Sequence, residues 1–170
     1  NEFYITSPIK KSIFTGDIVL FKGLRYLVLT PSCDIVLREN GSRNANHILF
    51  CKIRNLGEVI ENFSTLKADT GSSNSIRKKL ERLIQNNGKQ NFHFIPKNNS
   101  IDAGLIDFQD KVTIPETEVN QKIQDSEIIR IATVSMPFLK DIISRYSNYY
   151  ARQGAPDFDT NEIYRSIFKI

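Results

Sequence analysis

The segment from Gly16 to Ile53 carries the residue types best suited to chemistry in this chain of 170 residues. Within it, Ser32, Cys33 and Asp34 stand together directly after an apolar run. A hydroxyl, a thiol and a carboxylate in a row supply a nucleophile and an acid–base group, and loops at strand ends hold such groups rigidly in reach of solvent. These three residues are therefore the first candidate site.

The two cysteines and two histidines of the chain could in principle serve thiol catalysis or zinc binding. Cys33 as a nucleophile would need His47 or His93 as its base. Zinc would also need Cys51, but no Cys-x2-Cys pair occurs, and His47 and Cys51 on one strand would lie about 13 Å apart. The sequence thus predicts no metal and no cofactor, and the simplest interpretation is that both thiols are small buried side chains.

Asp17 and the glycines of the chain form no recognisable catalytic motif. Asp17 follows Gly16, and we interpret its carboxylate as a structural group that accepts hydrogen bonds from turn amides. Neither Gly-x-Gly-x-x-Gly nor Gly-x4-Gly-Lys-Ser/Thr occurs, so nothing points to nucleotide hydrolysis.

The charge of the chain permits an acidic partner. The formal net charge is +4, and residues 1 to 54 carry eight basic side chains against four acidic ones. Basic side chains beside aromatic ones are typical of surfaces that bind single-stranded nucleic acid. The candidate nucleic-acid-binding residues in this third of the chain are Lys22, Arg25, Lys52 and Arg54. A second basic cluster, Arg77-Lys78-Lys79 with Arg82, falls on a predicted helix, where it can also be an ordinary solvated face.

The composition predicts one globular domain, with 40% hydrophobic residues to build a core. The N-terminus has no signal-peptide pattern, no apolar run is long enough for a membrane, and two cysteines suit a reducing compartment. We therefore expect a cytoplasmic protein with no membrane partner. Because the chain begins with Asn1 rather than Met, we expect this domain to be excised from a longer protein.

Apolar runs bounded by turn residues predict six or seven strands. The runs are 18–21, 26–29, 47–53, 92–95, 104–108, 111–114 and 127–134. Residues 56–88 form a predicted helical insertion, because Ile76, Leu80, Leu83 and Ile84 share one helix face.

Residues 135–170 are predicted as C-terminal helices. Ser135 can cap a helix whose apolar stripe runs from Leu139 to Tyr150, and Asp159 can cap a second, shorter one. With a β core from 1–54 and 91–134, the prediction is a single α+β domain. It is mainly antiparallel β, an SH3-like or related small barrel with a helical insertion and a C-terminal helix.

The order of elements in the first third resembles the opening of the MazF/PemK toxin family. The resemblance rests on Gly16-Asp17-Ile18-Val19, Arg25-Tyr26-Leu27-Val28-Leu29-Thr30-Pro31-Ser32 and Ile48-Leu49-Phe50-Cys51-Lys52-Ile53. It implies a small SH3-like barrel and a metal-independent endoribonuclease in which Arg25 stabilises charge on a phosphate. The family's Arg-Pro dipeptide is Arg25-Tyr26 here, and Cys51-Lys52-Ile53 replaces its polar strand end, which removes the family's catalytic partner. The candidate catalytic residues are then Arg25 with a group from Ser32, Cys33 or Asp34.

A second resemblance is to prokaryotic proteins that share a Thr-x-Ser-Cys-Asp string after a strand. They also share segments like Ala132-Thr133-Val134-Ser135-Met136-Pro137-Phe138, Arg145-Tyr146 and Gly154-Ala155-Pro156-Asp157. This resemblance implies a part in multidomain bacterial signalling or defence systems. The sequence accordingly predicts a module that binds single-stranded nucleic acid or docks to a protein or another domain, with a MazF/PemK-type endoribonuclease as the alternative.

Overall fold

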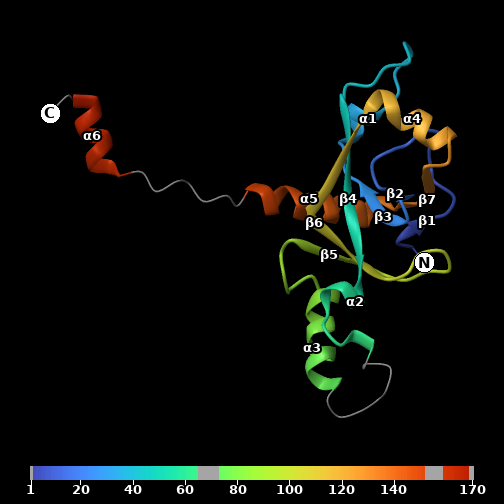
Figure 1. Cartoon of the computed structure of the whole chain (residues 1–170), viewed down its shortest axis with the longest axis horizontal. Coiled ribbons are helices and arrows are strands. Elements are labelled where there is room, and N and C mark those ends of the chain that lie inside the picture. The colour runs from blue at the N-terminus through green and yellow to red at the C-terminus, as the bar shows by residue number, and fades with distance from the viewer. Residues whose placement is uncertain (1, 65–72, 152–158, 169–170) are drawn as a thin grey trace.

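The computed structural model describes residues 2–64, 73–151 and 159–168 of the chain. One antiparallel sheet of seven strands runs in the order β1-β7-β2-β3-β4-β6-β5 (Figure 1). Its strands are β1 (Tyr4–Ile5), β2 (Asp17–Phe21), β3 (Leu24–Val28), β4 (His47–Asn55), β5 (Phe92–Ile95), β6 (Gly104–Pro115) and β7 (Ile128–Val134). The helices are α1 (Ser32–Ile35), α2 (Leu56–Val59), α3 (Ser73–Ile84), α4 (Glu116–Gln124), α5 (Met136–Ala151) and α6 (Thr160–Phe168).

The predicted α+β class, with strands in the first third, a helical insertion and a long C-terminal helix, is confirmed. The runs 104–108 and 111–114 belong to one strand, β6, because Gln109 and Asp110 continue it. Helix α4 was not predicted, although Pro115 before two acidic residues is a helix-start signal. The Gly154–Asp157 motif of the second resemblance lies outside the described residues. None of the described helices is long and apolar enough to cross a lipid bilayer.

The predicted small barrel is wrong, because the sheet is not closed. Its edge strands, β1 and β5, do not pair with each other. Strands β4 and β6 change register between Cys51 and Ile53, an irregularity of the β-bulge kind. Farther along, Gly104 lies opposite Asn55 and allows the strands to approach closely, because an added Cβ would lie 2.7 Å from the Arg54 carbonyl oxygen. The Tyr4 hydroxyl on β1 nevertheless donates a hydrogen bond of 2.6 Å to the main-chain carbonyl of Pro96, directly after β5.

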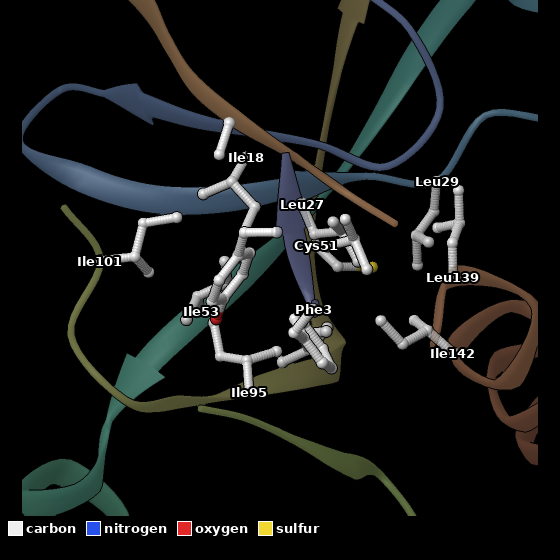
Figure 2. Packing of buried hydrophobic residues seen from close by; sticks show 14 of the residues in the cluster. Phe3, Ile18, Leu27, Leu29, Cys51, Ile53, Ile95, Ile101, Leu139 and Ile142 are labelled. Atoms are coloured by element: carbon white, nitrogen blue, oxygen red, sulfur yellow. The ribbon is translucent and has the colours of Figure 1, made fainter. Parts of the chain in front are cut away.

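Side chains alternate between two cores on the two faces of the sheet. On one face Leu27, Cys51 and Ile53 pack with residues of α5, including Leu139 and Ile142 (Figure 2). On the other face, side chains such as Val28, Phe50 and Ile48 pack against Ile35 of α1 and Val119 of α4. A third, smaller core lies under the insertion, where α2 and α3 pack on β5 and β6. The alternation follows from the two-residue period of a strand.

The carboxylate of Asp17, at the start of β2, ties three distant segments together. It is fully buried and accepts hydrogen bonds from the Thr133 hydroxyl at 2.6 Å, from Arg130 Nε at 2.9 Å and from the Phe14 amide at 2.9 Å. Arg130 in turn donates to the main-chain carbonyls of Lys11 and Lys10, both at 2.8 Å. Burial raises the pKa of Asp17, and the surrounding donors oppose that rise. The interpretation of Asp17 as a structural group is thus supported, with Arg130 as an additional partner.

Replacing Asp17 by Asn should destabilise the fold strongly. The substitution removes the negative partner of a mostly buried guanidinium, a change that typically costs about 3 kcal/mol. Urea denaturation followed by circular dichroism measures the free energy of unfolding.

The matched control is Asp102→Asn, because the Asp102 side chain is 78% exposed in its ion pair with Lys97. This control should cost less than about 0.5 kcal/mol. The double variant Asp17→Asn/Arg130→Gln should cost less than the sum of its single changes, because it removes both charges. Equal stability losses for Asp17→Asn and Asp102→Asn would contradict the proposed importance of this network.

Candidate functional site

The four predicted nucleic-acid-binding residues do not form one open basic surface. Lys22 is exposed in the turn between β2 and β3, with its ammonium 5.2 Å from the Phe21 ring centroid. Arg25, on β3, donates to Asn55 Oδ1 at 2.7 Å and to the Asp102 carbonyl. Its guanidinium is therefore engaged in holding the loop before β6 onto the sheet.

Lys52 and Arg54, on β4, are neutralised by carboxylates. Arg54 Nε lies 2.7 Å from Asp107 Oδ2, and Arg54 Nη2 lies 2.9 Å from Asp110 Oδ2. Lys52 Nζ lies 3.7 Å from the same Asp110 carboxylate, and Glu58 approaches Arg54 from α2 at 3.7 Å. Three carboxylates thus surround two cations, which is unfavourable for binding a phosphate backbone.

The candidate catalytic residues Ser32, Cys33 and Asp34 lie on α1, a short helical turn after β3. Arg25 stands near the opposite end of β3, about 13 Å away in strand rise alone. It also shares the sheet face of Leu27, whereas α1 packs through Ile35 on the other face. The structure therefore does not bring Arg25 together with the α1 side chains.

The cysteines and histidines are also dispersed. Cys51 is fully buried in the core, and burial raises the pKa of its thiol to about 12. Cys33 is exposed, so the interpretation that both thiols are buried is wrong for this residue. His47 is exposed at the start of β4, and His93 is buried on β5. No group of three potential metal ligands occurs among the residues that the structure describes.

His93 is buried without a hydrogen bond to its Nδ1 atom. The Asp141 carboxylate of α5 lies 3.9 Å from this nitrogen, beyond hydrogen-bonding distance. Burial lowers the pKa of His93 to about 4, and nearby Arg145 acts in the same direction while Asp141 opposes it. The histidine is therefore neutral at physiological pH.

A pocket of about 420 Å³, which we call the lysine pocket, opens between α1 and the segment that precedes β2. One wall is Lys10, Lys11, Ser12 and Phe14, and the other is Ser32, Cys33, Val36 and Leu37. Of the three α1 residues singled out from the sequence, Ser32 and Cys33 line this pocket and Asp34 does not. The basic residues that share the pocket with them are lysines and not Arg25. No described carboxylate forms an ion pair with Lys10 or Lys11.

Two arginines that sequence reasoning missed, the buried Arg43 and the largely buried Arg130, hold the walls of this pocket. Arg130 binds the carbonyls of Lys10 and Lys11. Arg43 donates from Nε to the Ile35 carbonyl at 2.8 Å and pairs with Glu116 at 2.5 Å. The sequence did contain one indication of this role. Arg130 is a charged residue inside an otherwise apolar strand, and such a residue needs a partner of opposite charge.

The outer side of α3 is the most cationic exposed surface of the insertion. Its inner side places Ile76 and Leu83 in the small third core. The outer side carries Arg77, Lys78, Lys79 and Arg82, all of them exposed. None of these four side chains forms an ion pair or a hydrogen bond with another described residue. We call this surface the α3 basic face.

The two thiols should react very differently in the native protein. Ellman's reagent should modify Cys33 rapidly and leave Cys51 unmodified, because only the first is accessible. Denaturation in guanidinium chloride should expose Cys51 and allow Ellman's reagent to modify it. The variant Cys33→Ser should show no rapid native reaction, and a rapid reaction of Cys51 in that variant would contradict its burial.

Stability should fall at acidic pH because of His93. Since its folded pKa is about 4 and its unfolded pKa about 6.5, the unfolded state takes up the proton first, and stability is lost as pH falls below about 6.5. The loss from this group should reach about 2 kcal/mol by about pH 5. Denaturation of the wild type and of His93→Gln across this range measures it.

His47→Gln is the matched control, because His47 is the other histidine of the chain and is exposed. It should keep the wild-type pH dependence, whereas His93→Gln should flatten it. Identical slopes for His93→Gln and the wild type would show that His93 is not the titrating group.

Comparison with known proteins gives no indication of function, so the function of the domain is argued from the geometry described above. No protein-family model, curated protein or solved structure matches the chain.

Proposed function

We propose that this domain is a nucleic-acid-binding module that holds single strands at the α3 basic face. The observation that carries the proposal is the presence of four exposed cations on one helix, none of them engaged by another described residue. The resemblance to prokaryotic proteins with a Thr-x-Ser-Cys-Asp string supports a bacterial regulatory or defence protein as the setting of this module.

The contrast with the β4 cations supports this choice of surface. Lys52 and Arg54 already have carboxylate partners, so binding a phosphate would require breaking those pairs. Binding a phosphate at the α3 basic face breaks no ion pair with a described residue. The interaction of the α3 cations with a polyanion releases counterions from the nucleic acid, and this release supplies most of the sequence-independent affinity.

The anchoring of α3 also suits a binding role. Ile76 and Leu83 fix the helix on Phe92 and Leu105, so its cations sit on a packed element rather than on a loose segment. The helix lies beyond the end of β4, next to α2 and away from α1 and α4 (Figure 1). A strand of nucleic acid could therefore contact it without crossing the sheet.

An endoribonuclease of the MazF/PemK type is less well supported by the geometry. Arg25 is hydrogen-bonded to Asn55 and to the Asp102 carbonyl, and it stands apart from Ser32, Cys33 and Asp34. We therefore favour binding over cleavage. Docking of a protein to the same domain becomes the expected function if nucleic acid does not bind.

The test compares the wild type with the charge-reversal variant Lys78→Glu/Lys79→Glu. Fluorescence anisotropy with a labelled, mixed-sequence single-stranded RNA gives the affinity at several salt concentrations. The wild type should bind with a steep salt dependence, and the variant should bind roughly tenfold or more weakly. Its salt slope should also decrease, by about 0.7 for each phosphate that the variant no longer neutralises.

The matched control reverses two exposed lysines elsewhere, Lys97→Glu/Lys140→Glu, with the same change in net charge. It should retain most of the affinity if the α3 basic face is the binding surface. Equal losses of affinity in the two variants would indicate a non-specific effect of net charge. No binding at low salt would refute the proposal, and cleavage of the RNA that Arg25→Ala abolishes would favour the ribonuclease.

A further inference from the structure

Hydrogen bonds from two largely buried arginines fix the main chain in both walls of the lysine pocket. Arg130, whose side chain is only 11% exposed, fixes the carbonyls of Lys10 and Lys11 in one wall. Arg43, whose side chain is fully buried, fixes the Ile35 carbonyl behind the other wall. Each guanidinium is itself held by a carboxylate, Asp17 or Glu116. The two walls are therefore preorganised before any ligand arrives.

One part of the pocket is cationic and polar. Lys10 and Lys11 are adjacent and form no ion pair with a described carboxylate, and Ser12 and Ser32 also line the cavity. Two ammonium groups match the charge of a phosphate monoester, which carries close to two negative charges at neutral pH. Serine hydroxyls can donate to its remaining oxygens.

The other part of the pocket is apolar and includes an aromatic ring. Val36 and Leu37 are 45% and 44% exposed, so a ligand can still remove apolar surface from water there. Phe14, which is half-buried and packs partly against the core, also lines this part of the pocket, where an aromatic ring is suited to contact a planar group. Lys10 Nζ lies 5.6 Å from the centroid of the Phe14 ring. One nucleotide is therefore long enough to contact both the lysine, through its phosphate, and the ring, through its base.

From this arrangement we propose that the lysine pocket binds a nucleoside monophosphate. The phosphate lies between Lys10 and Lys11, and the base contacts Phe14 and the apolar wall. The volume of about 420 Å³ is within the usual range of small-molecule sites, about 300–1,000 Å³. The ligand is either a free nucleotide or the 5′-phosphorylated end of a strand, which share this chemistry.

This site is independent of the proposed binding surface on α3. The pocket is lined by residues of α1. Helix α1 lies near the start of β4, whereas α2 and α3 lie near the other end of that strand (Figure 1). The nine residues of β4 separate the two ends by about 27 Å. Variants of one site should therefore leave the other unchanged.

Cys33 provides a direct readout, because it lines the pocket and is the accessible thiol, whereas Cys51 is buried. The experiment measures the rate at which N-ethylmaleimide modifies Cys33 in the whole chain, with AMP, adenosine or inorganic phosphate present. AMP should slow the modification roughly tenfold at saturation, and calorimetry should give the same affinity. Adenosine and phosphate should each protect far less, since each fills only part of the pocket.

The variant Lys10→Gln/Lys11→Gln should weaken protection by AMP roughly tenfold or more, whereas Lys140→Gln on α5 should not change it. The variant Lys78→Glu/Lys79→Glu should also keep the protection, so a failure of the α3 proposal would not affect this one. Protection by a 5′-phosphorylated oligonucleotide, but not by its 5′-hydroxyl form, would identify a strand end as the ligand; protection by AMP alone would identify a free nucleotide.

Absence of protection and of binding heat with AMP, GMP, CMP and UMP would overturn the proposal. Equal protection in the wild type and in Lys10→Gln/Lys11→Gln would overturn it as well, because the phosphate would then lie elsewhere. Circular dichroism and the buried Cys51 thiol report whether each variant is folded.

Discussion

The buried carboxylate of Asp17 is the interaction on which most of the structure depends. It joins the start of β2 to the end of β7 through Thr133 and Arg130, and it holds the segment before β2 through the Phe14 amide. A charge in this position is tolerated only because its oxygens accept several hydrogen bonds and an arginine neutralises it. Arg130 also fixes the main chain of the lysine pocket, since its remaining donors bind the carbonyls of Lys10 and Lys11.

Two groups of cations in this protein differ in a way that their sequence does not reveal. Arg43, Arg54 and Arg130 are engaged by carboxylates and serve the fold. The lysines of the lysine pocket and the side chains of the α3 basic face have no such partners among the described residues. Only cations of the second kind can meet a phosphate without first giving up an ion pair, and so the two proposed binding surfaces are built from them.

Much of the fold could be predicted because the signals are local. Alternating or continuous apolar runs correctly indicated most strands, and the stripe of apolar residues after Ser135 correctly indicated α5. Closure of the sheet could not be predicted in this way. It depends on whether the two edges pair, and here β1 is only two residues long and pairs with β7 alone. The short α4 was missed because its apolar positions, Val119 and Ile123, are few.

Part of the lining of the lysine pocket could be predicted, whereas the roles of the candidate site residues stay a prediction. The sequence by itself indicated that Ser32, Cys33 and Asp34 follow a strand, and Ser32 and Cys33 do line a cavity. It could not indicate which cations share that cavity, because Lys10 and Lys11 are more than twenty positions away along the chain. The sequence alone therefore determined most of the helices and strands, because these follow from local periodicity. It also determined how many charged side chains the protein has. The tertiary structure decided which of those charges are neutralised and which stay free, because ion pairing depends on contacts between residues remote in sequence.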